Sequence, residues 1–461
     1  MPRLTDFPAP RTLRTLARRC SSVMALMLFA APLFAQGAQA PLALTLGEAA
    51  RLAARQSLPT QAALLRADAA DTRVLQRRAD LLPNITGAAE TNSRTFNTAT
   101  LGISFPAAPG SEPFFNPDGE VLGPVPTTDV RARIQQGIYD PSVNARLRLA
   151  RQQSVAARTE ATQVGEASAA QAAVAYVRVL RSQAVFDARS ADSTLAADLL
   201  RIARETLRAG TGVALDVTRA ESQLVSIRSQ LIGARVERDK AQLELHRALN
   251  LPHDLPLRMA DALDVDDMQL PTEAAAMASA LAKRPDLAVL DAQIASARLS
   301  ERAVRAERLP SVSAVADNGF IGKNLTNMLN TWTWGVRVSV PVFDGLRREA
   351  RIREQGVAER ELETRRSDVA AQVGVDVRSA LLDAAATREA VSAAEERLKL
   401  AEQEVSQARD RFTAGVSGNL DVTQALLGLS GARTQLVDAL ASRQLARISI
   451  ARSQGALTSL R

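Results

Sequence analysis

The amino-acid sequence predicts a mainly α protein with a small β part, built from two copies of one unit. Aromatic residues make up only 3% of the 461 residues, while alanine, leucine, arginine, glutamine and glutamate dominate, a composition typical of long helices. The stretches 142–208 and 345–413 contain no proline, so each can continue as one helix. Both run into nearly the same motif, RAGTGVALDV at 208–217 and TAGVSGNLDV at 413–422. The repeated glycine turn predicts two long helical hairpins.

Residues 1–40 have the features of a secretory signal peptide, and we expect them to be removed from the mature protein. Five arginines precede an apolar run at 23–35, and the small-residue stretch QGAQA follows it. Cleavage after Ala40 would leave Pro41 beside the cut bond, which usually blocks cleavage, so a cut near Gly37 is the alternative. The single cysteine, Cys20, lies in this leader, so the mature chain is expected to have no thiol and no disulfide.

Loss of the leader also changes the charge balance. The full chain has a net charge of +7, and the leader takes five arginines and one aspartate with it, which leaves +3. This small excess gives little support to nucleic-acid binding, and we expect no such partner. No later stretch approaches the ~20 continuous apolar residues of a membrane-spanning helix. If the chain enters a membrane, we expect it to do so as strands.

Internal similarity extends over most of the chain. RRADLLPNITGAA at 77–89 is matched by VRAERLPSVSAVA at 304–316, and GIYDPSVNARLRLA at 137–150 by PVFDGLRREARIRE at 341–354. Such self-similarity predicts one supersecondary unit written twice. The extra proline and glycine at 106–126 predict a long loop in the first copy.

These matches divide the chain into a leader, two repeats and a connector. Each repeat is expected to contain a helix, a β-hairpin and then a long α-hairpin. The expected boundaries are 1–40 for the leader, 41–249 for the first repeat (β-hairpin 84–139, tip near 210–216), 250–272 for the connector, and 273–461 for the second repeat (β-hairpin 311–343, tip near 415–421).

The segment after each turn supplies a partner for the long helix before it. Residues spaced alternately three and four apart form the 3.5-residue repeat of a coiled-coil seam. The two seams are Val217, Ala220, Leu224, Ile227, Leu231, Ala234, Arg238, Ala241 and Leu245, and Val422, Ala425, Leu429, Ala432, Leu436, Ala439, Arg443, Ala446 and Ile450. Each seam carries an arginine at the same step, which is expected either to meet an acidic partner or to extend into solvent.

Strand patterns occur only between the helical parts. WTWGVRVSV at 332–340 alternates strictly, with Trp332 and Trp334 on the same face as three valines and with Arg337 on the other. A half-buried sheet of a soluble protein would alternate in the same way. The aromatic residues favour a membrane, because nine of the twelve that remain after the leader lie in the two strand-bearing segments. Those expected at the membrane interface are Tyr139, Trp332, Trp334 and Phe343.

The set of ordered motifs resembles the TolC-like outer-membrane efflux proteins, over roughly residues 44–456. The motifs are Leu-Thr-Leu-x-Glu-Ala at 44–49, Arg-Pro-Asp-Leu at 284–287, Val-Pro-Val-Phe-Asp-Gly at 340–345 and the two glycine turns. The resemblance implies a homotrimer whose twelve strands form one β-barrel in the outer membrane, continued by an α-helical tunnel in the periplasm. It also implies outer-membrane lipid, a periplasmic adaptor and an inner-membrane pump as partners, in tripartite efflux or type I secretion.

By the same resemblance, the glycine turns are periplasmic tips at which the adaptor docks. The residues so assigned are Gly210, Gly212, Leu215, Gly415, Gly418 and Leu420. Asp216 and Asp421 match positions that line the tunnel constriction, where three carboxylates would form a ring favouring cations. The alternative is an ordinary acidic residue stabilised by the dipole of the returning helix. Gly212, Ser417 and Phe412 depart from relatives that close the tip with charged or phenolic side chains.

Other functional classes receive little support from the sequence. The mature chain has two histidines, His246 and His253, and no cysteine, so we expect no metal site, no cofactor and no enzyme activity. GTGVAL at 210–215 follows a helix rather than a strand, which is wrong for a dinucleotide loop. A periplasmic coiled-coil adaptor is the alternative to a channel, although a single hairpin between β-rich modules would not repeat after 205 residues. The transported substrate is not encoded in any recognisable motif.

Overall fold

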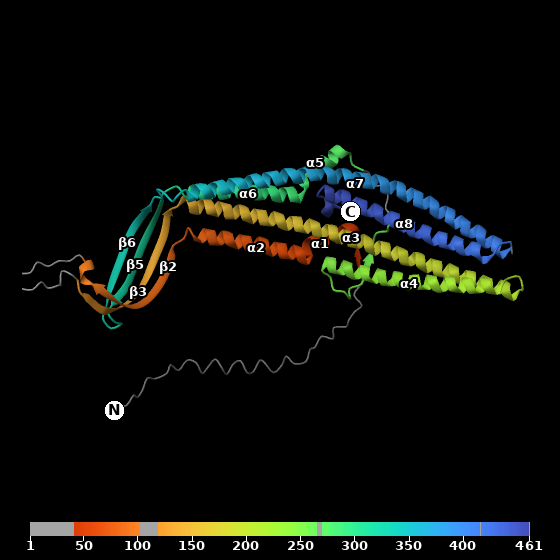
Figure 1. Cartoon of the computed structure of the whole chain (residues 1–461), viewed down its shortest axis with the longest axis horizontal. Coiled ribbons are helices and arrows are strands. Elements are labelled where there is room, and N and C mark those ends of the chain that lie inside the picture. The colour runs from red at the N-terminus through yellow and green to blue at the C-terminus, as the bar shows by residue number, and fades with distance from the viewer. Residues whose placement is uncertain (1–40, 102–118, 265–269, 415, 461) are drawn as a thin grey trace, which may run out of the picture.

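The computed structural model describes residues 41–101, 119–264, 270–414 and 416–460. They form one elongated molecule, with a sheet at one end and long helices that run away from it (Figure 1). The expected leader, residues 106–118 of the expected loop, and Gly415 lie outside the described residues. Helices account for most of the described chain and strands for a small part, which confirms the predicted fold class.

Each copy places two helices before its strands and a long hairpin after them. The helices of the first copy are α1 (Leu46–Gln56), α2 (Leu58–Ala79), α3 (Pro141–Arg208) and α4 (Ala214–Leu249). Those of the second are α5 (Glu273–Lys283), α6 (Pro285–Ala306), α7 (Arg347–Thr413) and α8 (Asn419–Ser453). The two longest, α3 and α7, have 68 and 67 residues. Short 3-10 helices lie at Thr98–Leu101 (η1) and Leu457–Ser459 (η2).

Local sequence signals explain where these helices begin. Asp140 caps α3, because its carboxylate accepts from the amides of Ser142 at 2.9 Å and Val143 at 3.3 Å. Pro141 occupies the first turn, where a missing amide hydrogen has no cost. Ser57 caps α2 in the same way, again with a proline in the first turn. Asp140, the aspartate of the repeated segment at 137–150, is therefore the N-cap of the first long helix.

The sheet has four antiparallel strands. They are β2 (Asn84–Asn97), β3 (Val121–Tyr139), β5 (Ser311–Gly322) and β6 (Met328–Ser339), in the order β2-β3-β5-β6. The hairpin of the first copy therefore lies directly beside that of the second. A separate parallel pair joins β1 (Leu42–Leu44) to β4 (Leu257–Met259) near the middle of the molecule (Figure 1).

One expectation about the loop at 106–126 is wrong. Residues 121–126 belong to β3 and pair with β2, with Val121 opposite Asn97 and Pro126 opposite Ser93. Gly123 reaches this arrangement with a φ of +110°, next to a shift in register between Arg94 and Phe96. Proline and glycine are tolerated here because they lie beside a β-bulge, where the ladder is already interrupted.

The long helix α3 is the centre of the helical part. It packs against α2 and α6 near the sheet and against α4 and α8 towards the tips, and α7 packs against α6 and α8 (Figure 1). Where these regions meet, the fully buried Tyr176 donates a hydrogen bond of 2.8 Å to the carbonyl of Leu44. None of the described helices is long and apolar enough to cross a membrane.

In both hairpins, residues of the predicted coiled-coil seam lie at the contact between the two helices. Ala220, Leu224 and Ile227 are buried with residues of α3, and Ala425, Leu429 and Ala432 with Ala401 and Val405 of α7. The seam arginines differ from each other. Arg443 pairs with Asp264 at 3.0 Å, whereas the guanidinium of Arg238 pairs with the adjacent Asp239 and lies 4.5 Å from the ring centre of Phe186.

Candidate functional site at the hairpin tips and the sheet face

The first tip is a tight helix-ending turn. α3 ends at Arg208, and Gly210 adopts a φ of +77°, which L side chains rarely allow. The amides of Thr211 and Gly212 both donate to the carbonyl of Thr206, each at 3.1 Å. These bonds satisfy groups that would be left unpaired at the helix end. Glycine is therefore needed at 210 for the chain to reverse between α3 and α4.

The second tip repeats this backbone geometry. Ala414 has the same φ of −76° and ψ of −3° as Ala209 in the first tip. The amide of Val416 donates to the carbonyl of Arg411 at 2.9 Å, as Thr211 does to Thr206. At these described positions the repeat in sequence is also a repeat in conformation, and Gly418 precedes the first residue of α8.

The two tips are joined to each other. The side-chain amide of Asn419, which is buried, donates to the backbone carbonyl of Asp216 at 2.8 Å. Phe412 and Val422 of the second tip belong to the same buried cluster as Leu199 of α3 and Leu224 of α4. The four helix ends therefore form one packed unit at the far end of the molecule from the sheet (Figure 1).

The two candidate aspartates have different surroundings. Each lies in the first turn of its helix, where the helix dipole stabilises a carboxylate. Asp216 is only 9% exposed, whereas Asp421 is exposed. The constriction role expected for both aspartates stays a prediction, and in the single copy Asp421 is the more exposed of the two.

Apolar side chains project from both tips. Val213 and Leu215 lie at the start of α4. In the second tip Leu420, which matches Leu215, lies at the start of α8, and Val416 lies in the turn before it. All four are exposed, Val416 to 70% and Leu215 to 56%. Exposed apolar groups clustered at the end of a protein are characteristic of a docking surface.

A buried ion pair links the hairpins nearer the middle of the molecule. The Asp192 carboxylate on α3 is completely buried and accepts from Arg433 of α8 at 2.7 Å. Arg189 lies 3.4 Å from the same carboxylate and also donates to Ser430 and Thr434 of α8. Two guanidinium groups compensate for removing this carboxylate from water. This link is not predictable from the sequence, because nothing in the periodicity distinguishes Asp192 from the other charges of α3.

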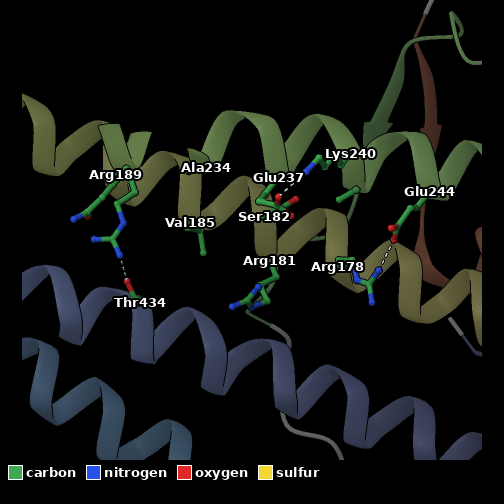
Figure 2. A pocket seen from close by; sticks show the side chains of 12 residues that line it. Arg178, Arg181, Ser182, Val185, Arg189, Ala234, Glu237, Lys240, Glu244 and Thr434 are labelled. Atoms are coloured by element: carbon green, nitrogen blue, oxygen red, sulfur yellow. Dashed lines mark hydrogen bonds and ion pairs between the residues drawn. The ribbon is translucent and has the colours of Figure 1, made fainter. Parts of the chain in front are cut away.

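A groove of about 540 Å³ lies between α3 and α4 beside this link, with Thr434 of α8 at its edge (Figure 2). Arg178 and Glu244 pair across it. Ser182 donates to the carbonyl of Val179 at 2.9 Å within its own helix, and neither histidine nor cysteine lines the groove. Arg178 and Glu244 therefore bind each other and Ser182 binds its own helix, so these side chains do not form a catalytic arrangement.

The sheet has one apolar and one polar face. Trp334 pairs with Ala316, and Val336 with Ala314, on a face from which Trp332 and Trp334 project, the latter 71% exposed. On the opposite face Arg131 binds Asp129 at 2.7 Å and Asp317 at 2.9 Å. Tyr139 and Phe343, also expected at a membrane interface, are exposed at the end of the sheet near the helices.

Two of the sequence motifs have structural explanations. Thr45 and Glu48 form a capping box at the start of α1, since the Thr45 amide donates to the Glu48 carboxylate at 2.8 Å and the Glu48 amide donates to the Thr45 hydroxyl at 3.2 Å. In the Arg-Pro-Asp-Leu motif, Arg284 forms ion pairs with Asp286 at 2.6 Å and with Asp376 of α7 at 2.7 Å. Partial burial acts to raise the pKa of Asp376, but hydrogen bonds from Gln372 and Arg284 outweigh it and hold the pKa below its usual value.

One of the two histidines contacts backbone carbonyl groups through both ring nitrogens. His246 is buried, with Nδ1 2.7 Å from the carbonyl oxygen of Gln242 and Nε2 2.7 Å from that of Leu255. Within the described ranges, no group of three or more His, Cys, Asp or Glu residues could hold a metal ion.

The sequence profile of the outer membrane efflux protein family matches residues 49–251 and 276–456. The toluene efflux pump outer membrane protein TtgF of Pseudomonas putida is 30% identical over 204 residues, which cover 42% of this chain and 41% of TtgF. The chain therefore spans about two fifths of the length of this relative.

Solved structures share the fold over a larger part of the chain. The Campylobacter jejuni CmeC outer membrane channel matches with a TM-score of 0.72 and 14% identity, over 89% of this chain and 85% of CmeC. The outer-membrane channel OprN matches with a TM-score of 0.71 and 17% identity, over 89% of both chains. Together with the profile match to both repeats, the arrangement of sheet and hairpins shows that this chain belongs to the outer membrane efflux protein family.

Proposed function

We propose that the protein is the outer-membrane exit duct of a tripartite efflux system. It would pass substrates from an inner-membrane pump and a periplasmic adaptor to the outside of the cell. The observation that carries this proposal is the separation of two surfaces on one elongated molecule (Figure 1). An apolar, tryptophan-bearing sheet face lies at one end, and paired hairpin tips with exposed apolar groups lie at the other.

The sheet is the proposed part in the outer membrane. Its apolar face suits the lipid, with the aromatic residues at the interface, and its polar face, with Arg131 held between two aspartates, suits water. Among the described strands, β2 and β6 lie at the two edges of the sheet and each has a neighbour on one side only. Because an unpaired strand edge is too costly in lipid, we propose that three copies pool their strands, as expected for a homotrimer.

The tips are the proposed docking site of the adaptor. Leu215 and Leu420 occupy matching places on the two hairpins and are both exposed. A partner helix could bury them without disturbing the packed unit behind them, since Phe412 and Val422 already fill its core. The exposed Asp421 is the proposed residue of the tunnel constriction.

The proposed function is tested by expressing the full chain in its host after deletion of the chromosomal copy. We expect the protein in the outer-membrane fraction as a detergent-stable trimer, and we expect it to restore resistance to toxic compounds. Toluene and antibiotics are tested first, because the names of TtgF and of the antibiotic efflux pump protein ArpC refer to them. Recovery in the soluble periplasmic fraction would contradict the proposal.

A further inference from the structure

The apolar face of the sheet ends in a polar patch on the side away from the helices. The strand pairing places four polar side chains on the same face as the exposed tryptophans, towards the turn between β5 and β6. We call these residues, together with the nearest tryptophan, the outer patch: Thr91, Thr128, Asn318, Asn330 and Trp332. The opposite ends of β5 and β6 join α6 and α7. Polar groups on a face that otherwise suits lipid need a partner other than hydrocarbon.

The two amide side chains of the outer patch keep free hydrogen-bonding groups. Nδ2 of Asn330 donates to Oδ1 of Asn318 at 3.0 Å and to the carbonyl of Gly319 at 3.3 Å. Nδ2 of Asn318 and Oδ1 of Asn330 have no hydrogen-bond partner among the described residues, and both side chains are exposed. The patch therefore offers one free donor and one free acceptor, side by side, to a group outside the protein.

The outer patch contains an aromatic ring and no charge. The side chain of Trp332 is 64% exposed, and its residue pairs directly with Asn318 on the neighbouring strand. Within the described strands, no Asp, Glu, Lys or Arg stands on this face of the sheet. A head group bound mainly through phosphate would call for Arg or Lys. An exposed ring beside uncharged donors and acceptors instead suits a sugar, which presents an apolar face of C–H groups and a rim of hydroxyls.

The spacing of the aromatic residues places the outer patch at the outer surface of the membrane. Trp332 and Phe343 are eleven positions apart. Extended backbone spans at most about 37 Å over that interval, or about 29 Å across the membrane at a strand tilt near 40°. The apolar band of strands in an outer membrane is about 25 Å tall. With Phe343 at the inner interface, Trp332 lies at the outer one, and Asn330, two residues nearer the turn, lies beyond the hydrocarbon.

We propose that the outer patch binds the sugar head group of a glycolipid in the outer leaflet of the outer membrane. The proposal rests on the proposed function, because it requires the apolar face of the sheet to lie in that membrane. The ring of Trp332 packs against the C–H face of one sugar, while Asn318 and Asn330 bond to its hydroxyls. Such contacts fix the height of the sheet in the membrane from its outer side.

Fluorescence can test this proposal, because Trp332 and Trp334 are the two tryptophans of the chain. Trp334→Phe leaves Trp332 as the reporter, and Trp332→Phe leaves Trp334. The full chain is inserted into vesicles of phosphatidylethanolamine and phosphatidylglycerol, with or without rough lipopolysaccharide as the glycolipid probe. In Trp334→Phe the lipopolysaccharide should lower quenching by acrylamide by about half, because a sugar covers one of the two faces of the ring. In Trp332→Phe quenching should change little, since Trp334 lies two residues further into the apolar band.

A second pair of variants separates recognition of the sugar from simple shielding by a bulky lipid. Asn318→Ala with Asn330→Ala, in the Trp334→Phe background, should abolish the protection of the ring. The matched control is Asn84→Ala with Asn92→Ala, at exposed positions on the opposite face of the sheet, which should keep the protection. Protection that survives in the first pair, or that additional phosphatidylglycerol produces equally well, would overturn the proposal.

The outcomes distinguish this proposal from the proposed function. A protein that stays in the soluble periplasmic fraction, or that inserts into neither kind of vesicle, contradicts the proposed function and the glycolipid site with it. A protein that inserts and restores resistance, but whose Trp332 is quenched equally with and without lipopolysaccharide, contradicts the glycolipid site alone.

Discussion

The side chain of Asn419 donates a 2.8 Å hydrogen bond to the backbone carbonyl of Asp216, which lies 203 residues earlier in the chain. The bond joins the first turn of α8 to the first turn of α4. Through it, the tip of the second hairpin is fixed to the tip of the first by a buried polar contact. Any separation of the two hairpins at this end must break it.

Replacing Asn419 should therefore loosen the tips. In Asn419→Ala the carbonyl of Asp216 loses its partner, which we expect to cost about 1–3 kcal/mol in stability. The conductance of single channels in planar bilayers should rise, because the tips separate more easily. Gln424→Ala, at an exposed position of α8, is the control and should leave conductance unchanged. A single-channel conductance of Asn419→Ala equal to that of the wild type would contradict a role for this bond in holding the tips together.

Removal of the buried carboxylate of Asp192 should have a larger effect. Asp192→Ala leaves Arg189 and Arg433 without their shared partner, and breaking a buried pair in this way costs about 3–5 kcal/mol. The apparent melting temperature of the detergent-solubilised protein should fall. Asp198→Asn, which removes an exposed carboxylate 3.8 Å from Arg201, is the matched control and should change it little. Equal changes of melting temperature in the two variants would contradict a larger contribution of Asp192 to stability.

The exposure of the two tip aspartates predicts unequal effects on ion selectivity. Asp421→Asn should lower the preference for cations over anions in planar bilayers, because it removes one exposed carboxylate from every copy at the entrance. Asp216→Asn, at a buried site, should change this ratio less. Reversal potentials under a salt gradient measure the ratio. An unchanged reversal potential in Asp421→Asn would leave this residue with only its role in the first turn of α8.

The apolar tip residues predict the strength of adaptor binding. Leu215→Ser combined with Leu420→Ser should weaken recovery of the chain with its adaptor after cross-linking in cells, and resistance should fall in parallel. The double variant should still form trimers, because both side chains are exposed in the single copy. Leu64→Ser with Leu65→Ser, at exposed positions of α2, is the control for loss of apolar surface. Unchanged adaptor recovery in the tip variant would place the docking site elsewhere.

The lowered pKa of Asp376 predicts a dependence on pH. A carboxylate whose pKa is lower in the folded than in the unfolded state stabilises the fold above the unfolded value of about 4, and this contribution is lost as the pH falls through the folded value. Asp376→Asn should therefore melt at a lower temperature than the wild type at pH 7, and the difference should shrink in strong acid. Asp383→Asn, exposed on the same helix, should show no such difference. A difference in melting temperature between Asp376→Asn and the wild type that stays constant with pH would indicate a cause other than ionisation.

Several features of this protein were determined by the sequence alone. The lengths of α3 and α7 follow from proline-free stretches, the seams from a 3.5-residue repeat, and the two faces of β6 from strict alternation. Each of these signals is periodic and lies within one segment, so it can be read without knowledge of the partner segments. The turn conformation at Gly210 follows in the same way from residues that are neighbours in the chain.

The tertiary structure decided which equivalent residues have different surroundings. Asp216 and Asp421 have the same local sequence, yet only Asp216 is buried. Asp192 resembles the other charges of α3 until it is placed beside Arg433, 241 residues away. The strand pairing of residues 121–126 was likewise hidden by their proline and glycine content. Burial and ion pairing depend on which helix faces lie against each other, and two copies of one local pattern can occupy different places in the packing.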